Sequence, residues 1–183
     1  MKLNLPNKLT ILRIVMVPFF IACFFLDRWL PWWNYLAAAV FFVADKTDIV
    51  DGYLARTQNL VTNFGKFMDP IADKLLFCSA FILLTWLGWL SPVLCILFIA
   101  REIAISGFRL VCVQSGTVIA ANWTGKLKST LQVIAILAML LKNPFFSAVG
   151  VPFDQIMMYL AAAATLWSAL DYILRNRKAV KWN

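Results

Sequence analysis

An acidic stretch of the chain reads Asp48-Ile-Val-Asp51-Gly52-Tyr-Leu-Ala55-Arg56, then eight residues, then Gly65-Lys-Phe-Met-Asp69-Pro-Ile-Ala-Asp73. Together with Asp45, it holds five of the nine acidic residues within 29 positions. It joins two runs rich in apolar residues, 34–56 and 65–87, and each is long enough to cross a bilayer as a helix, which takes about 20 residues. A charged side chain at membrane depth is costly and is usually paired and functional. The stretch therefore predicts a membrane hairpin that carries a functional site at its turn.

The rest of the chain continues the apolar pattern. Hydrophobic residues make up 62% of its 183 residues and charged residues 14%, whereas a soluble domain averages about 25% charged. Six spans are predicted, at residues 9–26, 34–56, 65–87, 92–113, 125–141 and 154–174. We therefore expect an all-α integral membrane protein with six transmembrane helices. A single membrane domain is predicted over 1–183, with a short interfacial segment at 1–8 and a basic cytoplasmic tail at 175–183.

The charge of the chain fits a membrane protein better than a nucleic-acid-binding one. The net charge is +8, but the basic residues are dispersed among apolar helices, so no nucleic acid is expected as a partner. Fifteen of the 17 Lys and Arg residues fall on one side of the predicted spans, against Arg28 and Lys142 on the other. By the positive-inside rule, both termini then face the cytoplasm. The four cysteines lie singly in apolar runs and there is no histidine, which argues against a disulfide framework or a zinc site.

The acidic residues of the hairpin are spaced as helical pairs. Asp48 and Asp51 are three residues apart and Asp69 and Asp73 are four apart, so each pair lies on one face of its helix. An antiparallel hairpin brings the two pairs together near its turn. Four carboxylates in a medium of low dielectric repel one another strongly, and a divalent cation removes that conflict. Oxygen ligands without His or Cys favour Mg²⁺ or Mn²⁺, with Ca²⁺ as an alternative, and four carboxylates suit two ions.

Small and cationic residues stand between the acidic pairs. Gly52 and Ala55 either clear a groove in which a substrate approaches the backbone, or allow close packing against another helix. Arg56 offers a planar donor that suits a phosphate. The structural alternative for the whole cluster is a network of ion pairs with neighbouring lysines, which has no use for a metal.

Taken together, these residues fit the pattern DxxDGxxAR(x8)GxxxDxxxD at every fixed position, and the stretch resembles the signature of the CDP-alcohol phosphatidyltransferases. That family consists of membrane proteins of six helices, usually homodimers, which transfer a phosphatidyl or related group from a CDP-linked lipid to an alcohol and release CMP. The resemblance implies metal ligands at Asp48, Asp51, Asp69 and Asp73, with Asp69 and Asp73 also the candidates for the catalytic base. It implies contacts to the CDP-lipid from Gly52, Ala55, Arg56 and Gly65. Asp45 and Lys46 are charges that the pattern does not specify, and they either pair locally or alter the acidic cluster.

Three longer stretches, residues 4–13, 63–74 and 100–109, resemble the bacterial family members that use glycerol 3-phosphate. This resemblance implies CDP-diacylglycerol as donor, glycerol 3-phosphate as acceptor and a cytoplasmic-face site in the bacterial inner membrane, among membrane lipids. Serine, inositol phosphate and phosphatidylglycerol are the alternative acceptors. A cation transporter is the alternative from another class, but transporters are typically built from inverted repeats around a midplane site, and the chain shows no repeat.

An acceptor with its own phosphate requires a second cationic pocket. The candidates are Arg101, Arg109, Lys126 and Lys128. Arg101 lies about 12 Å deeper than Arg109 at 1.5 Å per residue, so its alternative partners are Glu102 or the acidic cluster. Lys126 and Lys128 are two residues apart and point to different faces, so one of them is expected to extend to the lipid headgroups.

The start of the chain has two interpretations. Asn7 and Thr10 are predicted to line the CDP-lipid site, and Arg13 is a further candidate to line its nucleotide pocket. Alternatively, they and Arg13 cap the first span and anchor it by the positive-inside rule.

Overall fold

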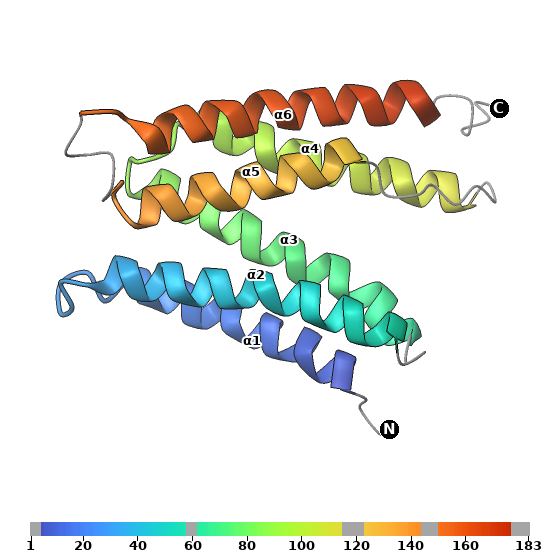
Figure 1. The fold of residues 1–183 in the computed structure, drawn as a ribbon, viewed down its shortest axis with the longest axis horizontal. Coiled ribbons are helices and arrows are strands. Elements are labelled where there is room, and N and C mark those ends of the chain that lie inside the picture. Colours follow the sequence, from blue (N-terminus) through green and yellow to red (C-terminus); the bar gives the residue numbers. More distant parts are fainter. Residues whose placement is uncertain (1–4, 58–61, 115–122, 144–149, 177–183) are drawn as a thin grey trace. The chain divides into compact units, whose positions relative to one another are not determined.

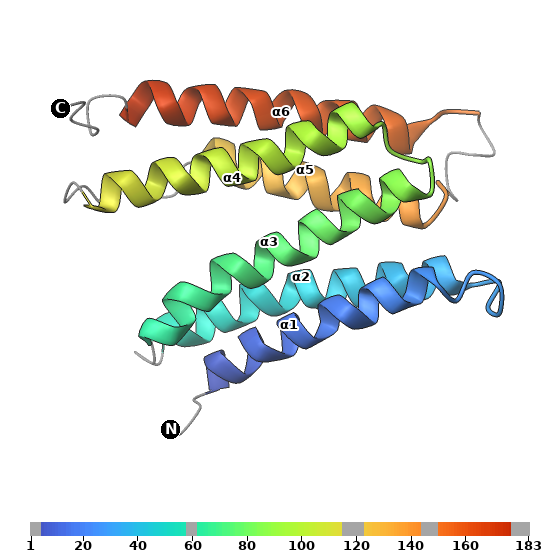
Figure 2. The ribbon, with the colours of Figure 1, turned by 180° about the vertical axis from the view of Figure 1, so that it is seen from behind.

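The computed structural model describes residues 5–57, 62–114, 123–143 and 150–176, without the side chains of residues 5, 6, 49–56, 63, 64, 66, 67, 113 and 114. Within these ranges, every regular element is an α-helix (Figures 1 and 2). The helices are α1 (Leu5–Phe24), α2 (Trp33–Thr57), α3 (Asn63–Trp86), α4 (Pro92–Gln114), α5 (Trp123–Leu140) and α6 (Phe153–Asn176). Each coincides with one predicted span, and no boundary differs by more than four residues. The all-α prediction is confirmed.

The largest difference lies at the start of the chain, where residues 5–8 form the first turn of α1. Two stretches qualify as membrane spans by length and hydropathy, Asn7–Phe24 and Phe153–Asn176. The acidic stretch and the predicted cationic pocket lie on the other four helices.

The chain divides into two compact units, and the first, Met1–Leu87, contains α1, α2 and α3. In this unit α1 packs along both α2 and α3. Aromatic rings fill the contact: Phe20 of α1 lies 5.7 Å from Phe41 of α2, which lies 5.6 Å from Phe77 of α3. Such ring pairs contribute about 0.5–1.5 kcal/mol each beyond their buried area. The aromatic core therefore fixes α1 against the two helices that carry the acidic residues.

The second unit, Gly88–Asn183, contains α4, α5 and α6, and α6 packs against both of the other helices. Hydrogen bonds between side chains also join its helices. Gln132 of α5 donates to Thr165 of α6 over 3.2 Å, and Thr124, two turns earlier on α5, donates to Asp171 over 3.0 Å. Asp171 also accepts from Arg175 over 2.5 Å. Asp171 therefore joins α5 to α6.

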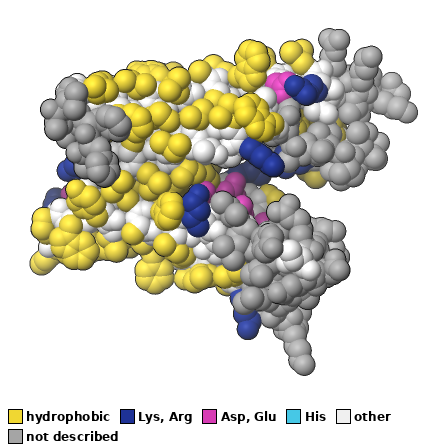
Figure 3. Space-filling view, viewed as in Figure 1, with side chains coloured by type: hydrophobic (Ala, Val, Ile, Leu, Met, Phe, Trp, Pro, Cys, Tyr) yellow, Lys and Arg dark blue, Asp and Glu magenta, His cyan; other side chains and the backbone are white. Residues whose placement is uncertain are grey.

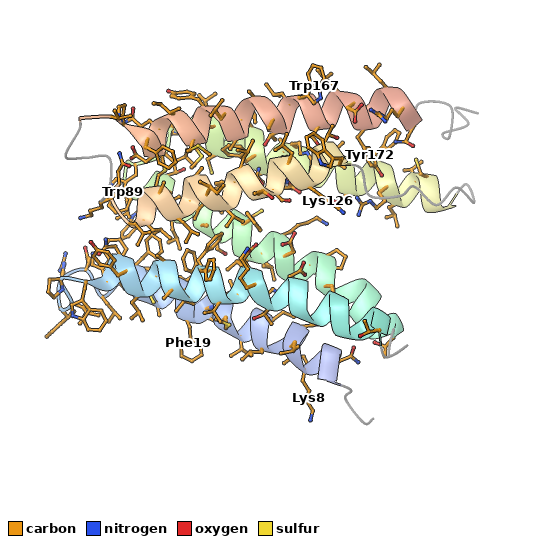
Figure 4. All side chains as sticks on the ribbon, viewed as in Figure 1. Lys8, Phe19, Trp89, Lys126, Trp167 and Tyr172 are labelled. Carbon is orange, nitrogen blue, oxygen red and sulfur yellow. The ribbon has the colours of Figure 1, made fainter. Side chains whose placement is uncertain are left out.

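Large apolar side chains are exposed along the helices of both units. Apolar side chains cover much of the face seen in Figure 3. Phe19 on α1 is 64% exposed and Trp167 on α6 is 69% exposed, and both point away from their units (Figure 4). Soluble monomers rarely expose contiguous apolar patches of more than a few hundred Å². A surface of this kind fits a lipid environment.

Candidate active site

The acidic residues lie where α2 ends and α3 begins. Asp48 is on the last turns of α2, and Asp69 and Asp73 are on the first turns of α3. Asp48 and Asp69 lie close enough for their charges to repel each other. The hairpin therefore brings together one acid from each predicted pair.

Part of the predicted cluster lies outside the described side chains. Asp51, Gly52, Ala55 and Arg56 belong to the helical backbone of α2, but their side chains are among those not described. Among the described side chains, no three acidic or thiol groups lie together as a metal site. Because Asp51 is absent from that set, the four-carboxylate site stays a prediction.

Arg13 of α1 is the cation that meets the cluster. Its side chain is 0% exposed and donates to Oδ1 of Asp48 over 2.7 Å, and its Nε donates to the carbonyl oxygen of Ala44 over 3.2 Å. A residue that anchors a helix at a membrane surface keeps its charged head in water. The burial of its guanidinium does not fit the anchoring alternative for Arg13, and its contact with Asp48 places it at the acidic cluster.

Asn7 and Thr10 connect α1 to the start of α3. The hydroxyl of Thr10, a residue 1% exposed, donates to Oδ1 of Asp69 over 2.5 Å. Asn7 is also buried and accepts a hydrogen bond of 2.7 Å from the hydroxyl of Thr62. Thr62 is the N-cap of α3, and its oxygen accepts from the amide of Gly65 over 3.0 Å. Thr62 was not predicted, although a threonine just before a helix start is a typical N-cap.

Gly65 has a packing reason to lack a side chain. A Cβ there would lie 3.3 Å from Oδ1 of Asn7, 3.4 Å from Oγ1 of Thr62 and 3.6 Å from Oδ2 of Asp69. The glycine therefore lets α1 and the capping threonine come close to the first turn of α3. Its predicted contact with the CDP-lipid is a separate role.

Asp45 and Lys46 pair with each other at 2.9 Å, and Lys46 also lies 5.3 Å from the centre of the Phe42 ring. The local alternative for these charges is confirmed. The carboxylate of Asp45 nevertheless acts on Asp48 as a second repelling charge.

The four basic candidates of the second unit form two groups. Arg101 donates to Glu102 over 3.1 Å and to Ser168 over 2.8 Å, and Lys128 also donates to Glu102. Glu102 is thus a partner of Arg101, which confirms one of the alternatives predicted for Arg101. The Nε of Arg101 is buried with no hydrogen-bond partner. One carboxylate therefore faces two cations.

Arg109 and Lys126 form the second, exposed group. Arg109 lies 5.9 Å from the centre of the Tyr172 ring, and Figure 4 shows Lys126 and Tyr172 in the same unit. Neither cation forms an ion pair within the described residues. Lys126 is exposed and Lys128 is buried, which confirms that they occupy different faces of α5. The exposed pair is therefore better placed to take a ligand from solution.

Comparison with known proteins identifies the family. The profile of the CDP-alcohol phosphatidyltransferases matches residues 3–167. The chain is 41% identical to the CDP-diacylglycerol--glycerol-3-phosphate 3-phosphatidyltransferase of Bacillus subtilis (strain 168), over 97% of each chain. It is 38% identical to the proteins of the same name from Escherichia coli (strain K12) and Shigella flexneri, again over 97% of each chain. The chain belongs to the CDP-alcohol phosphatidyltransferase family.

Proposed function

We propose that the protein transfers the phosphatidyl group of CDP-diacylglycerol to glycerol 3-phosphate, giving phosphatidylglycerophosphate and CMP in phospholipid biosynthesis. The likeness to enzymes of that name extends over 97% of the chain. The observation that carries the proposal is the meeting of Asp48 and Asp69 from two helices, with a buried donor on each carboxylate. An acidic centre held in place by buried donors is what transfer of a charged phosphoryl group requires.

The proposed site holds Mg²⁺ or Mn²⁺, two ions in all, on Asp48, Asp51 and Asp69, with Asp73 as either the fourth ligand or the base. The donor set fits, because it is made of carboxylates, the ligands that these ions prefer. Asp48 and Asp69 each have one oxygen held by α1 through Oδ1. When bound, the ions neutralise the charge of the donor pyrophosphate.

The residues of the chain then have separate tasks in the reaction. Asp73 accepts the proton of the acceptor's primary hydroxyl, with Asp69 as the alternative base. The freed oxygen bonds to the phosphorus that carries diacylglycerol, and the bond from that phosphorus to the CMP oxygen breaks. CMP leaves with the electron pair. The donor lies against Gly52, Ala55, Arg56 and Gly65, near Asn7 and Thr10.

The acceptor phosphate is assigned to Arg109 and Lys126. Both are exposed and form no ion pair among the described residues. Arg101 and Lys128 are less available to the acceptor phosphate, because their charges already meet Glu102.

For the setting of the enzyme, we propose six membrane spans with both termini in the cytoplasm, an active site on that face of the bacterial inner membrane, and a homodimer. The asymmetric placement of Lys and Arg supports this orientation. The exposed apolar helix faces support contact with lipid.

The test is release of CMP from CDP-diacylglycerol by the purified protein with Mg²⁺, supplied in turn with glycerol 3-phosphate, serine, inositol phosphate and phosphatidylglycerol. We expect release with glycerol 3-phosphate. Release with another acceptor alone would keep the reaction class and overturn the acceptor. No release with any acceptor would overturn the enzyme assignment, as a cation transporter would predict.

A further inference from the structure

Arg13 reaches the acidic cluster from outside the signature, and it is held at two points. Its terminal nitrogen donates to Asp48 over 2.7 Å, and its Nε donates to the carbonyl oxygen of Ala44 over 3.2 Å. Ala44 and Asp48 are four residues apart on α2, so the guanidinium spans the helical turn that carries the acid. Arg13 is therefore fixed relative to Asp48 by the backbone as well as by the carboxylate.

This geometry orients the carboxylate as well as balancing its charge. A guanidinium is planar, keeps its charge and presents its donors in a rigid fork, which a lysine does not. The donor is on Oδ1 of Asp48, whose side chain is still 46% exposed although Arg13 is fully buried. Asp48 is thus held from the inside while it stays accessible to a ligand.

Thr10 makes the equivalent contact with Asp69. Its hydroxyl donates to Oδ1, while Oδ2 of Asp69 faces the position of Gly65. Thr10 and Arg13 are three residues apart on α1 and share a face of that helix. One face of α1 therefore holds one oxygen of an acid on α2 and one oxygen of an acid on α3.

We propose that Arg13, together with Thr10, is a positioning residue for phosphatidyl transfer, which fixes the carboxylate of Asp48 so that its second oxygen binds a divalent cation. This inference rests on the cation dependence in the proposed function. As a bare positive charge, Arg13 would repel a cation and weaken its binding. As a positioning group, Arg13 strengthens cation binding. The two roles are therefore separated by whether the cation affinity rises or falls when Arg13 is replaced.

The experiment is a titration of the purified protein with Mn²⁺ alone, without substrates, read by electron paramagnetic resonance. We expect Arg13→Gln to weaken Mn²⁺ binding by about tenfold or more, since groups that orient metal ligands are worth about 10–100-fold in affinity. Thr10→Val, which removes one hydroxyl at similar volume, should weaken it in the same direction. The matched control is Lys46→Gln, which removes an equal charge two residues from Asp48. Lys46 pairs with Asp45 instead of Asp48. The Mn²⁺ affinity of this variant should not decrease.

Affinity that is unchanged or tighter in Arg13→Gln would overturn the positioning role. If Arg13→Gln does not fold, the test rests on Thr10→Val and Arg13→Lys. Wild-type Mn²⁺ affinity in both of these variants would overturn the positioning role. CMP release by the wild type is measured in parallel. A wild type that releases CMP while Arg13→Gln keeps its Mn²⁺ affinity refutes this inference alone, whereas a wild type that binds no Mn²⁺ refutes the cation dependence with it.

Discussion

Lys128 of α5 donates a hydrogen bond to Glu102 of α4, and both side chains are largely buried. Arg101 shares the same carboxylate, so the three side chains carry one excess positive charge. Buried ion pairs add little net stability when intact, but removal of one partner leaves an uncompensated charge. Among these three side chains, Glu102 is therefore the one whose loss should destabilise the protein most.

Glu102→Gln should destabilise the protein by about 3–5 kcal/mol, because it leaves Arg101 and Lys128 buried without their counter-charge. The measurement is thermal unfolding of the detergent-solubilised protein. The control is Asp27→Asn, which removes the same charge at an exposed position and should change stability by less than about 0.5 kcal/mol. Equal unfolding temperatures for the two variants would show that the Glu102 cluster contributes nothing specific to the fold.

Gly65→Ala should lower activity while the protein stays folded. The new Cβ would lie 3.3 Å from Oδ1 of Asn7 and 3.4 Å from Oγ1 of Thr62, tighter than most side-chain contacts, so the cap of α3 must shift. Asp69 lies one turn beyond and would move with it. Turnover with CDP-diacylglycerol is the measurement.

Gly107→Ala is the matched control for this substitution, because nothing lies within 4 Å of its added Cβ on α4. In an open helical position, alanine is favoured over glycine by about 1 kcal/mol. Gly107→Ala should therefore keep or raise stability and keep turnover. If Gly65→Ala behaves in the same way, the crowding around Gly65 has no functional importance.

The six helices were predictable because each is a long stretch rich in apolar residues, and such stretches can be recognised without their packing partners. The placement of Asp48 on α2 and of Asp69 and Asp73 on α3 was also predictable, because it follows from the local bounds of the two helices. Asp48 and Asp69 do approach each other, as an antiparallel hairpin requires.

The contacts of Arg13 could not be predicted in this way. An arginine near the start of a first span fits the positive-inside rule equally well when it is exposed, and its partner Asp48 is 35 residues away. The packing of α1 against α2 decides between the two interpretations, because it buries the guanidinium. The Lys128–Glu102 contact, over 26 residues, is likewise set by tertiary packing.

Arg109→Gln and Lys126→Gln should each raise the KM for glycerol 3-phosphate by about tenfold or more, and leave the KM for CDP-diacylglycerol unchanged. A hydrogen bond to a charged group is worth about 1.5–3 kcal/mol, which corresponds to that factor. Steady-state kinetics with each substrate varied in turn gives both constants.

Lys142→Gln is the control for these two variants. Lys142 follows the far end of α5 from Lys126 and lies 5.6 Å from the centre of the Trp89 ring, away from the proposed acceptor pocket. Its removal should change neither KM. A rise in the KM for both substrates in Arg109→Gln or Lys126→Gln would place that residue outside the acceptor pocket.

Asp69→Asn and Asp73→Asn should both reduce turnover by orders of magnitude in a protein that still folds, but for separable reasons. If Asp73 is the base, its loss removes about 10²–10⁴-fold in rate and leaves Mn²⁺ affinity close to that of the wild type. Asp69→Asn should weaken Mn²⁺ binding as well, because it replaces a ligand carboxylate. Asp45→Asn is the control, since Asp45 lies beside the cluster and pairs with Lys46, and its turnover should stay near that of the wild type. Near wild-type turnover in either signature variant would remove that residue from the reaction, and weaker Mn²⁺ binding in Asp73→Asn would make Asp73 a ligand and transfer the base to another group.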